Sequence, residues 1–180
     1  MKAVRSDDPV EFESFLARAR KGELLEISNR KPWQTRCATL ALLSHALEKG
    51  LDVCILAGTG GANFFDAEVC GLIGRLSDRG EVPRMLVWQE NDAKVSMHIK
   101  ALSASGKLNL RLSGTNKDFD KVPHFLLVGQ SAYRQEAGHP EYPPEIELPE
   151  IPARICFSDL IGGQRLRGLF DILWHASGGA

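Results

Sequence analysis

The stretch LDVCILAG, residues 51–58, constrains the fold of this chain more than any other part of the sequence. Its apolar residues follow one another without alternation, which is typical of a strand buried on both faces of a parallel sheet. A strong helical pattern over residues 32–50 precedes it, with leucines at helical spacing and Gly50 at its end. Parallel strands need long crossovers, usually helices, so the pattern predicts an α/β fold.

The rest of the chain continues this alternation. Helical patterns cover residues 8–22, 66–80, 91–106 and 159–177, with Asp92 near the start of the third. Strand patterns cover residues 23–28, 84–89, 107–113, 124–130, 131–136 and 153–158. The fourth and fifth of these strands form a predicted hairpin, and the proline-rich residues 138–152 are expected to be a surface loop. We therefore predict a single α/β domain over residues 1–180, with a mixed sheet flanked by helices.

Composition restricts the function only broadly. The net charge is -1, so no bulk positive field attracts nucleic acid or an anionic membrane, although a local basic patch is compatible with it. No apolar run is long enough to span a membrane and the N-terminus lacks the apolar core of a signal peptide, so we expect a cytoplasmic protein. The four cysteines are widely spaced, which favours reduced thiols in the core over a zinc site.

A glycine-rich stretch, AGTGGANFF, follows the buried strand. Gly58 and Gly60 match the first two glycines of a dinucleotide-binding fingerprint, whose backbone N–H groups cradle a phosphate. The third position is Asn63, and Glu90, the candidate acid for a ribose, lies further on than the usual spacing of about 20 residues. Residues 58–61 are therefore an alternative nucleotide site, and the simpler interpretation is a turn between strand and helix.

Asn29 and Arg30 follow a predicted strand and precede the helix over residues 32–50. Ligands of open α/β sheets bind at the carboxyl ends of strands, which makes both residues candidates for ligand binding. Lys31 and Arg36 add positive charge nearby. The alternative is a solvated loop in which Asn29 caps the helix.

Residues 122–136, VPHFLLVGQSAYRQE, combine a histidine after a proline with an apolar run, a turn and a polar strand. Pairing of the two strands would bring His124 within reach of Arg134 and Glu136. The latter two are two residues apart and share one strand face, and His139 is near enough in sequence to join them. The four side chains could form a structural polar network, or a pocket in which Arg134 binds a phosphate.

This stretch resembles the phospholipase D superfamily, whose motif is H-x-K-x-x-x-x-D in a strand-turn-strand. With His124 on the motif histidine, Leu126 stands at the lysine and Ser131 at the aspartate. The sequence FDILW at residues 170–174 also resembles the end of phospholipase D-like domains that lack the catalytic motif. The resemblance spans most of the chain and is weakest over residues 63–107.

The resemblance implies a phospholipase D-like fold and a role for each motif position. In the family the histidine attacks phosphorus, the lysine stabilises the phosphate charge, and the enzymes use two copies of the motif from one chain or from two protomers. The segment that begins at His98 is no second copy, because Ser105 replaces the aspartate and the pattern is helical. Members with one motif pair as symmetric dimers, which implies a homodimer here.

Three functional hypotheses remain. The first, from the resemblance, is a non-catalytic phospholipase D-like binding or assembly module that recognises a phosphate-containing ligand such as nucleic acid. The second is a divergent phosphodiesterase or nuclease, with His124 as the catalytic nucleophile, Arg134 in place of the lysine and Glu136 orienting the histidine. The third is a nucleotide-binding α/β protein that uses residues 58–61. We expect neither a metal nor a cofactor.

Overall fold

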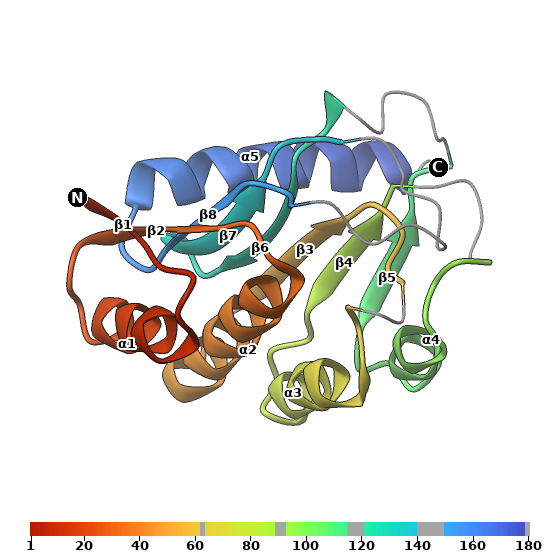
Figure 1. The fold of residues 1–180 in the computed structure, drawn as a ribbon. Helices are drawn as coiled ribbons and strands as arrows, with labels where there is room; N and C mark the ends of the chain where they lie inside the picture. The colour runs from red at the N-terminus through yellow and green to blue at the C-terminus, as the bar shows by residue number, and fades with distance from the viewer. Residues whose placement is uncertain (62–63, 89–92, 115–120, 140–149, 179–180) are drawn as a thin grey trace.

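The computed structural model describes residues 1–61, 64–88, 93–114, 121–139 and 150–178, which form one mixed sheet with helices on both faces (Figure 1). The strands are β1 (Lys2–Arg5), β2 (Leu25–Asn29), β3 (Val53–Ala57), β4 (Arg84–Val87), β5 (Asn109–Leu112), β6 (His124–Val128), β7 (Ala132–Glu136) and β8 (Ala153–Cys156). The helices are α1 (Pro9–Arg20), α2 (Pro32–Lys49), α3 (Ala67–Asp78), α4 (Met97–Ala104) and α5 (Leu160–Ser177).

The strand order across the sheet is β1-β2-β8-β7-β6-β3-β4-β5. Parallel pairing joins β1 to β2 and connects β3, β4 and β5, whereas the central strands β8, β7 and β6 are antiparallel to their neighbours. Helices α1 to α4 lie on one face of the sheet, and α5 crosses the other face (Figure 1). The predicted α/β fold with a mixed sheet is confirmed.

Two elements differ from the sequence-based prediction. Strand β1 was missed, because its residues are mostly exposed and give no apolar pattern; its parallel pairing with β2 defines it. Helix α4 begins at Met97 rather than near Asp92, and the side chain of Ser96 caps it by accepting a hydrogen bond from the N–H of Ile99. The cap therefore determines where the helix starts, whereas hydrophobic spacing alone predicted a start several residues before it in the sequence. Asp92 itself lies outside the described residues.

Each face of the sheet packs against its own apolar core. The larger core lies under α1 to α4 and includes Ile27, Ile55 and Leu126 from the sheet. The second core lies under α5, where Phe125, Leu127 and Tyr133 meet Leu166, Phe170 and Trp174 of the helix. The apolar side of α5 is therefore core, as its pattern predicted. Within the described residues, no helix is long and apolar enough to cross a membrane.

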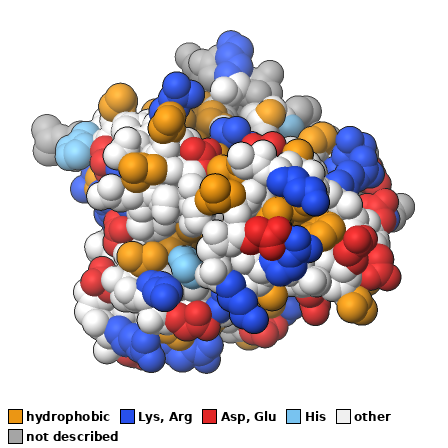
Figure 2. Space-filling view, turned by 90° about the vertical axis from the view of Figure 1, so that its left-hand side faces the viewer, with side chains coloured by type: hydrophobic (Ala, Val, Ile, Leu, Met, Phe, Trp, Pro, Cys, Tyr) orange, Lys and Arg blue, Asp and Glu red, His pale blue; other side chains and the backbone are white. Residues whose placement is uncertain are grey.

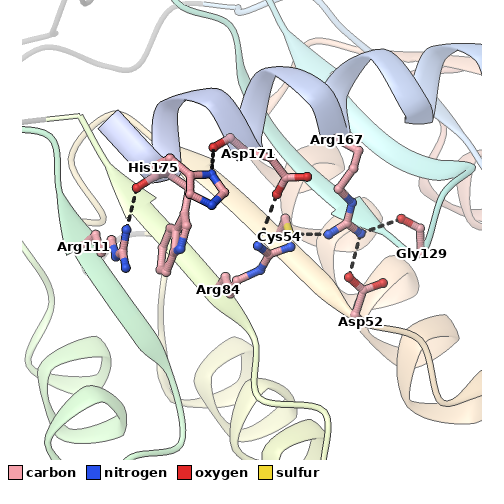
Figure 3. Close-up of polar contacts among 9 residues, drawn as sticks. Asp52, Cys54, Arg84, Arg111, Gly129, Arg167, Asp171 and His175 are labelled. Carbon is pink, nitrogen blue, oxygen red and sulfur yellow. Dashed lines mark hydrogen bonds and ion pairs between the residues drawn. The ribbon is translucent and has the colours of Figure 1, made fainter. Parts of the chain in front are cut away.

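Arginine side chains tie α5 to the sheet beneath it (Figure 3). Arg167 of α5 pairs with Asp52 at 2.7 Å, and Arg84 of β4 pairs with Asp171 of α5 at 3.2 Å. Both guanidinium groups also contact the Sγ atom of Cys54, at 2.9 Å from Arg167 and 3.3 Å from Arg84. These contacts hold the helix across β3 and β4.

The four cysteines are free thiols: Cys54, Cys70 and Cys156 are buried, and Cys37 is half-buried. Burial raises the pKa of the Cys54 thiol to about 11, although the nearby cations Arg167 and Arg84 oppose this shift. The thiol is therefore uncharged at neutral pH.

The start of α5 approaches the β6–β7 turn very closely. A Cβ atom on Gly163 would lie 2.1 Å from the backbone oxygen of Gln130, which no side-chain movement could relieve. By contrast, a Cβ atom on Gly168, further along the same helix, would meet nothing within 4 Å. Only a glycine at position 163 allows this contact between the helix and the turn.

We predict that Gly163→Ala lowers the free energy of unfolding by about 3 kcal/mol, because overpacking forces the helix away from the turn. Gly168→Ala is the matched control, and it should raise stability by up to about 1 kcal/mol because alanine favours the helix. Urea denaturation of both variants measures the difference. Equal stability of the two would contradict the close packing of α5 on the turn.

Candidate functional site

Polar side chains gather at one end of the central strands of the sheet, on the face covered by α2. Strand register places Glu136 at the end of β7 opposite His124 at the start of β6, and also opposite Ala153 of β8. Ala153 in turn lies opposite Asn29, the last residue of β2. The ends of four neighbouring strands therefore bring together residues that are distant in the sequence.

The carboxylate of Glu136 is the centre of this group. Its Oε1 atom lies 3.3 Å from Nδ1 of His124 and 3.5 Å from Nε2 of His139, and its Oε2 atom accepts a hydrogen bond from Nη2 of Arg134 at 2.6 Å. The two imidazole rings meet edge to face, with their centroids 4.8 Å apart. One carboxylate thus orients three cationic or proton-donating side chains.

Thr35, in the first turn of α2, extends the network toward the helix. Its Oγ1 atom accepts hydrogen bonds from Nη2 of Arg134 at 2.9 Å and from Nδ2 of Asn29 at 3.0 Å. We call these six residues the His124 site: Asn29, Thr35, His124, Arg134, Glu136 and His139. Sequence reasoning missed Thr35, although one signal was present: it stands one turn before Ala38 and Thr39, on the buried side of α2.

The His124 site is largely removed from solvent. The exposed fractions of its titratable side chains are 7% for Arg134, 8% for His124, 13% for Glu136 and 19% for His139. Burial alone would raise the pKa of Glu136, but the contacts with His124, His139 and Arg134 outweigh it and hold that pKa far below the ordinary glutamate value. Glu136 is therefore ionised, and its charge balances that of Arg134.

Hydrogen-bonding capacity remains within the His124 site. Nε of Arg134 and Oδ1 of Asn29 are buried and have no hydrogen-bond partner among the residues that the structure describes. The hydroxyl of Thr35 already accepts two hydrogen bonds, so its own proton is left to be donated to a third group. Buried groups of this kind are normally satisfied, which makes them candidates for contacts with a ligand.

The solved structures that share the arrangement of this chain include the following two. Nuc from Salmonella typhimurium, a phospholipase D family member, matches with a TM-score of 0.65 at 11% identity, over 86% of this chain and 96% of its own. TrmBL2, an archaeal chromatin protein whose structure shows a novel mode of DNA binding, matches with a TM-score of 0.57 at 14% identity. That match covers 92% of this chain and 59% of TrmBL2.

The fold of this chain is phospholipase D-like. No protein-family model and no curated protein sequence matches the chain. The likeness in structure thus extends over most of the chain, whereas the likeness in sequence is low.

The structure shows where the two residues lie that the family resemblance aligns with the motif lysine and aspartate. Leu126, aligned with the lysine, is 5% exposed and packs in the core under α2. It lies directly opposite Arg134 in the β6–β7 ladder. Ser131, which the resemblance aligns with the aspartate, lies in the turn between these strands, where its backbone oxygen accepts a hydrogen bond from the N–H of Asp159. Neither residue carries a charge.

The basic residues next to Asn29 are engaged elsewhere. Lys31 pairs with Asp7 at 3.6 Å, and Arg36 pairs with Asp66 at 3.1 Å. Arg30 is exposed, and no described contact joins its side chain to the His124 site. Of the six residues predicted to bind a ligand, the structure therefore brings five together and leaves Arg30 beside them.

The glycine-rich stretch forms a tight turn against β4. Gly60 has a φ angle of 64°, and a Cβ atom there would lie 3.2 Å from Cε of Met85. Helix α3 begins only at Ala67, and the carboxylate of Asp66 already accepts hydrogen bonds from its first N–H groups. The close approach to Met85 explains why residue 60 is a glycine. The Asp66 carboxylate places a negative charge at the N-terminus of α3, where a phosphate would bind. Asn63 and Glu90 lie outside the described residues.

Three residues of the His124 site carry atoms that metal ions bind. One nitrogen each of His124 and His139 and one carboxylate oxygen of Glu136 all lie within 4.8 Å of one another. Two imidazoles and one carboxylate form a donor set that suits divalent transition metals. The expectation of no metal depended on the spacing of the cysteines, which are not part of this cluster.

We predict that Glu136→Gln destabilises the protein by about 3 kcal/mol at pH 7, because it leaves the buried cation of Arg134 without a counter-charge. The pKa of Glu136 is lowered on folding, so its contribution is complete above the ordinary value of 4.5 and is lost as the pH falls below that value. The difference in unfolding free energy between wild type and variant should therefore shrink in acid.

The control is Glu23→Gln, which removes the partner of Arg18 in a pair whose side chains are both more than 40% exposed. Exposed ion pairs contribute little to stability, so this variant should unfold like the wild type. Denaturant titrations between pH 3 and pH 7 would test both. A Glu136→Gln variant as stable as the wild type at pH 7 would show that the carboxylate does not hold Arg134.

Proposed function

We propose that this chain is a phospholipase D-like binding module that recognises a phosphate group of nucleic acid at the His124 site and does not hydrolyse it. The observation that carries the proposal is the replacement of the motif lysine by Leu126, which is buried in the core. Transfer of a phosphoryl group requires cationic partners for its oxygens. Leucine offers neither a charge nor a hydrogen-bond donor, so the site keeps the histidine without the ammonium group that the family uses.

The remaining side chains favour recognition of an anion. Arg134 has an unused Nε–H donor among the described contacts, and Thr35 has a hydroxyl proton left to donate. Thr35 lies in the first turn of α2, and the guanidinium group of Arg134 contacts it. The dipole of this 18-residue helix favours negative charge at that end. Guanidinium groups bind phosphate oxygens with short, charge-assisted hydrogen bonds. Glu136 holds Arg134 in place for such a contact.

The charge of the surface argues for recognition by local contacts rather than by a broad field. The net charge of the chain is -1, and basic and acidic side chains are interspersed over the face shown in Figure 2. The likeness to TrmBL2, whose structure shows a mode of DNA binding, supports nucleic acid as the phosphate-bearing ligand. We therefore expect weak binding with few phosphate contacts.

Fluorescence anisotropy with labelled single- and double-stranded DNA, in buffer with EDTA, would test the proposal. Arg134→Gln should weaken binding to all sequences alike and lower the salt slope by about 1, because one phosphate contact is lost. Arg154→Gln is the matched control: Arg154 is exposed and its partner Gln135 lies on the other face of β7. No binding by the wild type, or equal loss in both variants, would exclude nucleic-acid recognition at this site.

The divergent phosphodiesterase remains a second candidate because of one geometric observation. Arg134 lies directly across the ladder from Leu126, and Nδ1 of His124 faces Glu136 at 3.3 Å. A carboxylate at Nδ1 orients an imidazole for attack through its other nitrogen, and Arg134 could supply the charge that the lysine would have carried.

Assays with bis(p-nitrophenyl) phosphate would separate the two candidates. We expect no turnover above background by the wild type, and hence no difference from His124→Ala. Turnover that disappears in His124→Ala but persists in His98→Ala, a substitution on the exposed side of α4, would favour the phosphodiesterase. The homodimer implied by the family resemblance stays a prediction, which light scattering on the purified chain can measure.

A further inference from the structure

We propose that the His124 site binds one divalent transition-metal ion, of the kind represented by Zn²⁺, through His124, Glu136 and His139. A zinc ion lies about 2.0–2.2 Å from imidazole nitrogens and carboxylate oxygens, so two ligand atoms of a tetrahedral site are about 3.4 Å apart. The Oε1 atom of Glu136 lies 3.3 Å from His124 Nδ1 and 3.5 Å from His139 Nε2.

The third distance, between the two imidazole nitrogens, is also compatible with one ion. The three donor atoms all lie within 4.8 Å of one another, so any approach that the imidazoles need to close around an ion is short. His124 is fixed in β6, but His139 lies three residues beyond the end of β7, outside any strand or helix. Movement of His139 alone would bring the three atoms into range.

Arg134 prepares the carboxylate for this role. It holds Oε2 of Glu136 at 2.6 Å, which leaves Oε1 facing both imidazoles. Ligands in metal sites are usually oriented by such a partner behind them. Burial also favours metal binding, because all three ligand side chains are less than 20% exposed, so that little water competes with them for the ion.

The donor set also indicates the coordination. Two histidines and one glutamate provide three protein ligands and leave a fourth position for water or an anion, as in catalytic rather than structural zinc sites. The ion, Glu136 and Arg134 together would carry a surplus of positive charge, which favours an anionic oxygen at the open position. Metal binding does not rest on recognition of nucleic acid, since the ion is measured by itself.

Isothermal titration of the full chain, stripped with EDTA and dialysed, with ZnCl₂ would test the proposal. We expect one Zn²⁺ per chain and a rise in melting temperature on binding. His139→Ala should lower the affinity by more than about 100-fold, since loss of even an indirect partner costs 10–100-fold. His139 lies outside the regular elements, so its variant should fold normally, which a melting curve without metal would verify.

The control variant is His98→Ala, which removes an exposed histidine of α4 and should bind Zn²⁺ like the wild type. Co²⁺ provides a second readout, because its visible absorption distinguishes tetrahedral coordination from the hydrated ion. Absence of saturable binding, or wild-type affinity in His139→Ala, would overturn the proposal. The two proposals fail separately, because DNA binding is measured in EDTA without the metal ion and Zn²⁺ binding is measured without DNA.

Discussion

The pairing of β6 with β7 is the constraint on which the candidate site depends. Its register sets His124 opposite Glu136 and Leu126 opposite Arg134, so that a histidine, a cation and a carboxylate share one face. A shift by one residue would turn all of these side chains to the opposite face. The apolar residues of β6 prevent such a shift, because they alternate between two separate cores. Packing of the sheet thus determines which side chains meet at this end of the central strands.

Local patterns predicted much of the fold and the inner part of the site. The unbroken apolar run of β3 predicted a sheet covered on both faces, and the hairpin pattern predicted that residues near His124 and Glu136 would meet. Both features depend on residues close in sequence, where spacing alone determines which side chains share a face. The phospholipase D-like fold required the family resemblance as well, since many sheets share this periodicity.

Contacts between residues that are far apart in the chain could not be predicted from the sequence. Thr35 and Arg134 are 99 positions apart, and Arg84 and Asp171 are 87 positions apart. No periodic pattern connects such residues, because their approach depends on the order of strands in the sheet and on the path of each helix over it. The short strand β1 was missed for a related reason, since only its partner β2 gives it structure.

The buried thiol of Cys54 can be used to measure local opening between α5 and the sheet. Cys54, Cys70 and Cys156 are buried, and Cys37 is half-buried. A thiol reagent in solution can reach Cys54 only when α5 lifts from the sheet and the guanidinium groups of Arg84 and Arg167 withdraw. The rate at which this sulfur is labelled therefore measures how often that layer opens, without any introduced probe.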